Sequence, residues 1–320
     1  MFFSIIIPVF NRPDEIRELL SSISTQDFLD FEVIVVEDGS TVDSEEICRD
    51  FESSFSLCYI FQENSGQGFA RNHGMRKAQG EFFIILDSDV VLPSDYLGKV
   101  FRAIQRRKLD AFGGPDAADS DFSDLQKAMD FAMTSFWTTG GIRGKLKDPA
   151  KYQARGFNMG VSRRVFEEIG GFADPNQGED IEWSIRIKKA GFKLELIKEA
   201  FVYHKRKNTL ISFAKQAFSF GRNRVNVSRY HPEAIQLVHC LPTGFLIFLI
   251  SIPVFGLIYT PIAKLELLAL GFWSMAILVS SGNRFGSVSV SLLSWATSII
   301  QLVSYGAGLL LERVKKSIAG

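Results

Sequence analysis

The 320-residue chain has few cysteines, few histidines and no excess of charge of either sign. Its three cysteines, Cys48, Cys58 and Cys240, show neither the spacing of a metal site nor a paired framework, which favours a reducing compartment. Since 36 basic residues balance 36 acidic ones, the net charge gives no sign of nucleic-acid binding, and we expect none. The first ten residues lack a basic segment ahead of an apolar one. We therefore interpret them as a strand and not as a secretion signal.

Charged residues are also nearly absent after Leu237, where three apolar stretches cover residues 241–260, 265–280 and 288–311. The first and third are long enough to span a bilayer, and the second is marginal. Helices buried in a soluble core are the alternative, but links of only a few residues make that packing hard to build. We expect residues 237–320 to form a membrane region with two or three transmembrane helices.

Basic residues flank the apolar stretches on both sides, at 222–229 and 313–316. Three spans would place these two clusters on opposite faces of the membrane, which the positive-inside rule disfavours. The second stretch is then either re-entrant or paired with the first as a hairpin, or the rule is overridden. The sequence leaves the number of spans open.

Residues 208–236 form a separate segment, in which phenylalanines alternate with Lys215, Arg222, Arg224 and Arg229. This composition predicts an amphipathic helix at the membrane surface, with its basic side chains toward anionic lipid headgroups. A solvated basic helix is the alternative.

The chain up to residue 207 alternates apolar strands with charged helical segments. Strands are predicted over residues 4–9, 31–36, 57–61 and 82–86, and helices over 13–23 and 69–78. This rhythm is typical of an α/β domain whose mostly parallel sheet carries helices on both faces. We expect residues 1–207 to form this domain.

The apolar run 82–86 ends in Asp87-Ser88-Asp89. In open α/β sheets, ligands bind beyond the carboxyl ends of such strands. Two carboxylates there offer hard oxygen ligands for Mg²⁺ or Mn²⁺, which takes its remaining oxygens from water and phosphates. A simple polar turn is the alternative.

Five motifs in this order resemble those of the family 2 glycosyltransferases, which have the Rossmann-like GT-A fold. They are IIIPVFN at residues 5–11, VVEDGS at 35–40, GQGFARN at 66–72, LDSD at 86–89 and GEDIEW at 178–183. The resemblance covers roughly residues 3–230. It implies a metal-dependent, inverting transfer of a sugar from a nucleotide-sugar donor.

The resemblance also assigns residues to the donor. Asp89 is the expected metal ligand, Asp87 the ribose contact that supports the metal through water, and Asp38 the acceptor for the N–H of a uridine base. Arg71 is expected to bind base or phosphate, since a guanidinium is always charged and can bond an oxyanion bidentately. The remaining expected nucleotide contacts are Pro8, Phe10, Asn11 and Ser88.

For the acceptor, Asp180 is the expected base that removes the proton from the attacking hydroxyl, with Glu179 as the alternative base. Both acids also suit the first turn of a helix, where they would complement its dipole. Asn158 is a candidate sugar contact. Trp183 either stacks on a sugar or fills the core.

His204 ends another strand-like run and is a candidate third metal ligand, although a single histidine is more often structural. Arg222 and Arg224 either clamp the diphosphate or anchor the chain to the bilayer.

The expected protein is a multi-pass enzyme of the inner (plasma) membrane with a cytoplasmic catalytic domain. Its acceptor would be a lipid-linked saccharide, a polyprenyl phosphate or a growing surface glycan.

The Gln-x-x-Arg-Trp motif of processive synthases is missing, because Ala217-Phe218-Ser219-Phe220 follows Gln216. A sugar nucleotidyltransferase is disfavoured, because the first strand lacks a Gly-rich basic loop. A nucleotide-binding pseudoenzyme is disfavoured by the intact acids Asp87, Asp89 and Asp180.

Overall fold

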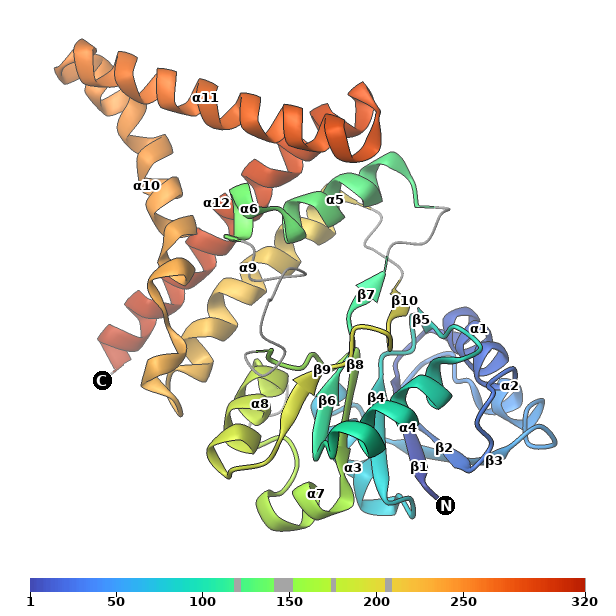
Figure 1. The fold of residues 1–320 in the computed structure, drawn as a ribbon. Helices are drawn as coiled ribbons and strands as arrows, with labels where there is room; N and C mark the ends of the chain where they lie inside the picture. Colours follow the sequence, from blue (N-terminus) through green and yellow to red (C-terminus); the bar gives the residue numbers. More distant parts are fainter. Residues whose placement is uncertain (118–121, 141–151, 174–176, 205–208, 320) are drawn as a thin grey trace. The chain divides into compact units, whose positions relative to one another are not determined.

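The computed structural model describes residues 1–117, 122–140, 152–173, 177–204 and 209–319. The chain divides into two compact units, which are described one at a time (Figure 1). The first unit comprises Met1–Asp119 and Lys147–Lys205, and the second comprises Ser120–Leu146 and Arg206–Gly320. Residues 120–146 stand between the two segments of the first unit in the sequence but belong to the second unit.

The first unit is built on a seven-stranded sheet in the order β3-β2-β1-β4-β8-β6-β9. Strands β1 to β4 are parallel, and β8 runs antiparallel to both β4 and β6. The strands are β1 (Phe3–Val9), β2 (Phe31–Asp38), β3 (Ser56–Gln62), β4 (Phe82–Leu86), β6 (Ala111–Gly113), β8 (Asn158–Ser162) and β9 (Leu194–Leu196). A second, three-stranded sheet contains β5 (Val90–Val91), β10 (Val202–His204) and β7 (Asp116–Ala117).

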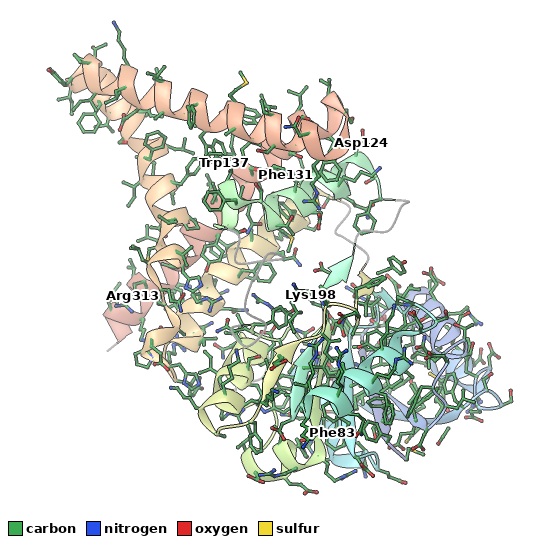
Figure 2. All side chains as sticks on the ribbon, in the orientation of Figure 1. Phe83, Asp124, Phe131, Trp137, Lys198 and Arg313 are labelled. Carbon is green, nitrogen blue, oxygen red and sulfur yellow. The ribbon has the colours of Figure 1, made fainter. Side chains whose placement is uncertain are left out.

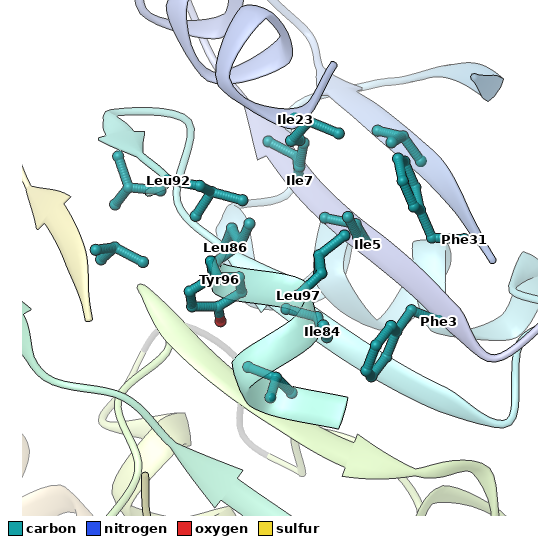
Figure 3. Close-up of a cluster of buried hydrophobic side chains, with 14 of the residues drawn as sticks. Phe3, Ile5, Ile7, Ile23, Phe31, Ile84, Leu86, Leu92, Tyr96 and Leu97 are labelled. Carbon is teal, nitrogen blue, oxygen red and sulfur yellow. The ribbon is translucent and has the colours of Figure 1, made fainter. Parts of the chain in front are cut away.

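Helices cover both faces of the large sheet, because successive side chains of a strand point to opposite sides. On one face, Phe3, Ile5 and Ile7 of β1 join a core with residues of α1 (Pro13–Ile23) and α4 (Tyr96–Arg107), as Figure 3 shows. Each fully buried side chain of this size contributes about 1.5–3 kcal/mol.

On the other face, Ile6 joins a core with residues of α3 (Gln67–Lys77), α7 (Arg163–Ile169) and α8 (Glu179–Lys189). The α3 helix packs closely on β1, since a Cβ at Gly74 would lie 2.6 Å from Cγ2 of Ile6. The short helix α2 (Glu45–Arg49) follows β2 and contributes Cys48 to the first core.

The second unit is helical. It contains α5 (Asp124–Thr134), α6 (Phe136–Thr139), α9 (Leu210–Val227), the 3-10 helix η2 (Pro232–Ala234), α10 (Leu237–Ile258), α11 (Thr260–Phe285) and α12 (Val288–Ala319). By length and composition, α10, α11 and α12 could each cross a membrane. The prediction of an α/β domain with a mostly parallel sheet, followed by apolar helices, is confirmed.

Helices α9 and α12 pack with their backbones in close approach. A Cβ at Gly221 of α9 would lie 2.1 Å from the carbonyl oxygen of Tyr305, and one at Gly308 of α12 would lie 2.1 Å from that of Phe218. Residues of α5 join the same bundle, in which Met129, Met133 and Phe213 form a small apolar cluster with Ile300 of α12 packed against it. Small residues at these positions are what allows the helices to approach so closely.

The two cysteines of the first unit differ in environment, which gives a test of the fold. Cys48 is 1% exposed, and burial raises the pKa of its thiol to about 12, whereas Cys58 is exposed on the edge strand β3. Because the thiolate is the reactive form, an alkylating reagent at pH 8 should modify Cys58 and leave Cys48 unmodified until denaturant is added. Mass spectrometry of the full chain in a Cys240→Ser background measures both rates. Equal rates at the two thiols would contradict the fold.

Candidate active site

Polar residues collect where β1, β2 and β4 end. These strands are parallel neighbours, so their carboxyl ends share one edge of the sheet. Asn11 and Arg12 follow β1, Asp38 is the last residue of β2, and Asp87 and Asp89 follow β4. The structure therefore brings the residues expected to contact the donor to the same edge.

Asn11 fastens the end of β1 to the loop after β2. Its side-chain Oδ1 accepts hydrogen bonds from the backbone N–H of Thr41 (2.9 Å) and Val42 (3.2 Å), and its own N–H donates to Oγ of Ser40 (2.7 Å). The backbone of Asn11 is left-handed, with φ of 52°, a conformation that asparagine tolerates better than most residues. Next to it, Pro8 is buried and the Phe10 ring is 49% exposed at the same edge.

Asp38 organises the loop that leads into α3. Its carboxylate accepts hydrogen bonds from Nε2 of Gln62 (2.7 Å) and from the backbone N–H of Ser65 (3.0 Å) and Gly66 (2.7 Å). Gly39 must be glycine, because its φ is 75° and a Cβ would lie 2.5 Å from the backbone nitrogen of Asn64. These three hydrogen bonds hold the buried Asp38 carboxylate in place at the edge of the sheet.

Arg71 of α3 lies at the centre of the site and is 2% exposed. Its Nη2 is 2.6 Å from Oδ1 of Asp87, and its Nη1 is 3.0 Å from Oε1 of Glu179. Burial alone would lower the pKa of the guanidinium, but the charges of Asp87 and Glu179 outweigh burial and raise it. Arg71 thereby joins the acid after β4 to the first turn of α8.

Glu179 and Asp180 open α8 and have different surroundings. Glu179 is buried, accepts a second hydrogen bond from Nε2 of Gln67 (3.2 Å), and has a raised pKa, first because of burial and then because of the neighbouring Asp180. Asp180 is half-buried and accepts hydrogen bonds from the backbone N–H of Gly156 (3.3 Å) and Ile181 (2.7 Å). Of the two acids, Asp180 is thus the more accessible.

Asp89 is ion-paired with Arg12, which directly follows Asn11. Burial lowers the pKa of Arg12, but Asp89 outweighs burial, so the pKa is raised. Ser88, between the two acids, is buried. His204 of β10 pairs with Val90 of β5, one residue beyond Asp89, so the register brings its backbone beside the acidic turn.

Asn158 and Trp183 lie in the interior of the first unit. The Asn158 amide accepts a hydrogen bond from the Tyr96 hydroxyl (2.6 Å) and donates one to the carbonyl oxygen of Ala200 (2.9 Å). Trp183 is fully buried, packs against Phe172 and donates from Nε1 to the carbonyl oxygen of Gly170 (2.9 Å). Asn158 pairs with Leu86 in the sheet register, so its backbone lies beside Asp87, whereas Trp183 is part of the core.

Arg222 and Arg224 belong to α9 in the second unit. The Nε of Arg222 is 3.1 Å from Oε2 of Glu312 of α12, and Arg224 is buried. Their assignment to a diphosphate stays a prediction.

The sequence did not single out Arg12, Gln67 or Phe172 as members of the site. Gln67 stands four residues before Arg71, on the same face of α3, and that spacing was the available signal. A Cβ at Gly156 would lie 2.6 Å from Nη1 of Arg71, so this glycine keeps the loop close to the guanidinium. Phe172 lies 5.6 Å from the Arg71 guanidinium, at cation–π distance.

No group of three or more histidine, cysteine, aspartate and glutamate side chains positioned to hold a metal occurs among the residues that the structure describes. The oxygen donors Asp87 and Asp89 nevertheless fit Mg²⁺ or Mn²⁺, because such ions are commonly held by one or two carboxylates together with substrate phosphates. At this edge of the sheet, each of these carboxylates is paired with an arginine.

Residues 4–170 match the family described as "Glycosyl transferase family 2". The glycosyltransferase AglE of Haloferax volcanii is 25% identical over 253 residues, which cover 77% of this chain and 80% of AglE. The glycosyltransferase GlyA of Streptococcus pneumoniae serotype 4 is 38% identical over 108 residues, which cover 33% of this chain but only 16% of GlyA.

Among solved structures, the mannosyltransferase PcManGT from Pyrobaculum calidifontis, in complex with GDP-Man and Mn²⁺, superposes with a TM-score of 0.64. The match has 17% sequence identity and covers 98% of this chain and 87% of that one. At this identity the likeness concerns the fold, and it confirms the GT-A fold that the sequence motifs predicted.

The Arg71 ion pairs predict a pH-dependent loss of stability in Arg71→Met. With Arg71 gone, the pKa of Glu179 should rise further above its unfolded value of about 4.3. A carboxyl group whose pKa is higher in the folded than in the unfolded protein stabilises the fold at low pH, and this contribution disappears as the pH rises through the folded pKa. Arg71→Met should therefore lose more stability at pH 8 than at pH 5. Removing one partner of a buried ion pair costs about 3–5 kcal/mol, which we expect at pH 8.

Urea unfolding followed by Trp183 fluorescence measures this loss, with Trp137, Trp273 and Trp295 replaced by phenylalanine in every protein compared. In the matched control Arg71→Met/Glu179→Gln, both charges of the pair are absent, so most of the pH-dependent loss should disappear. A loss in Arg71→Met that is the same at pH 5 and pH 8 would contradict the assigned role of the pair.

Proposed function

The chain belongs to glycosyl transferase family 2, and from this premise we propose an inverting transfer of a sugar from a nucleoside-diphosphate donor to an acceptor at a membrane. We propose a uridine nucleotide as donor, because of the motif that contains Asp38. The proposed acceptor is a lipid-linked saccharide, a polyprenyl phosphate or a growing surface glycan. The catalytic unit would face the cytoplasm, at the plasma membrane.

One observation carries the proposal: a single buried guanidinium contacts acids from both halves of the expected site. Arg71 pairs with Asp87 on the donor side and with Glu179 on α8, whose next residue is Asp180. In a transfer by single displacement, the donor and the base must be held in fixed positions relative to each other. The ion pairs of Arg71 supply that constraint.

Asp180 is the base of the proposed reaction. As the acceptor oxygen bonds to the anomeric carbon, the bond from that carbon to the β-phosphate oxygen breaks, and the hydroxyl proton passes to the Asp180 carboxylate. Attack on the face opposite the leaving diphosphate inverts the anomeric configuration. Glu179 is less suited to this role, because it is buried and its carboxylate is held by Arg71 and Gln67.

Asp89, Asp87 and His204 would hold a divalent cation. Such an ion, when bound, neutralises the charge that develops on the diphosphate. Asp87 keeps its position through Arg71, and Asp89 lies on the turn between β4 and β5, beside the backbone of β10. Mg²⁺ and Mn²⁺ both suit carboxylate oxygens, and a histidine ligand favours Mn²⁺.

The role of Asp180 is tested by Asp180→Asn. The amide keeps the size of the side chain but removes its basicity, so kcat should fall about 10²- to 10⁴-fold while the KM for the donor changes little. Transfer is measured with a panel of UDP- and GDP-sugars, Mn²⁺ or Mg²⁺, and a membrane lipid extract as acceptor. In the matched variant Glu179→Gln the base remains, so the fall in kcat should be smaller. Unchanged kcat in Asp180→Asn would remove Asp180 from the mechanism.

The ion pair between Arg12 and Asp89 predicts a competition at the cation site. Arg12 occupies Oδ2 of Asp89 and places a positive charge at the proposed cation site, so Arg12→Ala should bind Mn²⁺ more tightly than the parent when no donor is present. We expect an increase in affinity of about tenfold, measured by calorimetry or by the EPR signal of free Mn²⁺. Arg12→Lys, which keeps the charge, is the control and should stay near the parent. Equal Mn²⁺ affinity in parent and Arg12→Ala would contradict the competition.

A further inference from the structure

Helix α12 has two faces, one packed on α5 and α9 and one that is apolar and exposed. On the first face, Thr297 donates to the carbonyl oxygen of Ala128 of α5 (3.0 Å). On the same face, Oε2 of Glu312 lies 3.1 Å from Nε of Arg222 of α9. At about 100° per residue, the opposite side of α12 carries exposed apolar residues, which are Val288, Leu292, Trp295, Leu310 and Val314. This pattern suits a helix with protein on one side and lipid on the other.

Helices α5 and α9 begin on the same side of a membrane as the first unit. The α5 helix begins at Asp124 and α9 at Leu210, each five positions after a segment of the first unit ends. Five extended residues reach at most about 18 Å, which is less than the hydrocarbon thickness of about 30 Å. Since α9 also exposes Lys215 and part of Arg222, it lies at the membrane surface and does not cross the hydrocarbon.

Helix α12 runs beside α9 in the same direction. Ile300 packs against the apolar cluster that contains Phe213, near the start of α9. Further along, a Cβ at Gly308 would lie 2.1 Å from the carbonyl oxygen of Phe218. The two helices stay together as far as Glu312. Because α9 lies at the surface, this part of α12 lies there too.

The start of α10 and the last part of α11 both contact α12. The Thr243 hydroxyl of α10 donates to the carbonyl oxygen of Gly306 (3.2 Å). Nε1 of Trp295 donates to the hydroxyl of Ser274 of α11 (2.9 Å). Gly306 and Trp295 are on the apolar side of α12, about 17 Å apart along its axis. Both helices therefore leave the surface from the side of α12 that carries the apolar residues.

The end of α11 is also held by α5. Nη2 of Arg284 donates to Oδ2 of Asp130 (2.6 Å), and its Nη1 donates to the hydroxyl of Thr134 (2.9 Å). Since Asp130 and Thr134 belong to α5, the turn between α11 and α12 lies on the same side of the membrane as α5 and α9.

Trp137 of α6 contacts α11 near this end (Figure 2). Its Nε1 donates to the hydroxyl of Ser280 (3.1 Å), and its carbonyl oxygen accepts a hydrogen bond from Nε1 of Trp273 (3.0 Å). The neighbouring Phe136 ring is 69% exposed. Exposed aromatic rings at this level agree with a membrane interface, where tryptophan is enriched.

Away from α12, helices α10 and α11 meet as an antiparallel hairpin (Figure 1). The rings of Phe245 and Trp273 lie 4.9 Å apart. Nearer the turn at Tyr259, the Ser251 hydroxyl donates to Oε1 of Glu266 (2.7 Å). With 22 and 26 residues, the two helices are about 33 and 39 Å long, enough to cross the hydrocarbon.

The charges of the hairpin lie near its two ends. Lys264 and Glu266 stand within about two helical turns of Tyr259. Arg284 is in the last turn of α11. No other aspartate, glutamate, lysine or arginine occurs in residues 237–285. The middle of both helices is therefore free of charge, as a hydrocarbon environment requires.

We propose that only α10 and α11 cross the bilayer, as a hairpin whose turn at Tyr259 reaches the far face, and that α12 lies along the near surface with α5 and α9. Within their most apolar stretches, 0% of α10 and 11% of α11 is buried, against 39% of α12. The exposed apolar side chains of the hairpin face lipid acyl chains. The basic clusters 222–229 and 313–316 then share the near face, as the positive-inside rule requires of a cytoplasmic face.

Single-cysteine variants of the full chain test this topology, in a background in which all three native cysteines are serine. The variants are Glu233→Cys before α10, Tyr259→Cys at the turn of the hairpin, Asn283→Cys near the end of α11, and Ser317→Cys near the end of α12. A membrane-impermeant maleimide is applied to spheroplasts and to inverted membrane vesicles of a bacterial host. Labelling after detergent solubilisation gives the maximum for each variant. Ile258→Cys and Ile318→Cys repeat the two decisive positions, the turn and the end of α12.

We expect Tyr259→Cys to be labelled near its maximum in spheroplasts, and the other three near theirs in inverted vesicles. Labelling of Ser317→Cys from the same face as Tyr259→Cys would mean that α12 crosses as well, and it would overturn the proposal. Labelling of Asn283→Cys from that face would mean that α11 does not cross, and labelling of all four from one face that the hairpin does not. Either result would overturn the proposal too. Since no sugar transfer is measured, none of these outcomes depends on the proposed enzymatic activity.

Discussion

The buried guanidinium of Arg71 is the interaction on which the rest of the first unit depends. A charge this deep in the protein is tolerated only when it is paired and hydrogen-bonded. Its partners, Asp87 and Glu179, come from segments that are 16 and 108 residues away. Three other residues contact this group of charges: the Gln67 amide donates to Glu179, the Phe172 ring lies at cation–π distance from Arg71, and the Gly156 backbone approaches the guanidinium closely. The fold therefore fixes the distance between the end of β4 and the start of α8.

The donor edge of this site could be predicted from sequence, and the acceptor side only in part. Motifs that follow parallel strands must meet at one edge, so Asn11, Asp38, Asp87 and Asp89 were predictable from local pattern alone. Arg71, Asp87 and Glu179 were each named, but their pairing was not predicted, because an ion pair between segments so far apart leaves no periodic signal. The role of Asn158 as a sugar contact stays a prediction, and the sequence did not reveal that its amide bonds with Tyr96 and Ala200.

The helical unit was predictable in composition and not in arrangement. Hydropathy identifies α10, α11 and α12, because apolar length is a local property. It does not reveal that Glu312 lies between Arg222 and Arg229, nor that α5 and α6 belong to this unit. The conflict between three apolar stretches and the positive-inside rule was visible in the sequence.

The excursion of residues 120–146 into the helical unit has a consequence for synthesis of the protein. The central strand β8 follows this segment in the sequence, so the large sheet stays open until the ribosome has passed residue 162. The apolar side chains Met129 and Met133 of α5 stay unpacked even longer, because their packing partners Phe213 and Ile300 are synthesised later. The two units must mature in an interleaved order, and the nascent chain carries an uncovered apolar helix while its C-terminal apolar helices are still being translated.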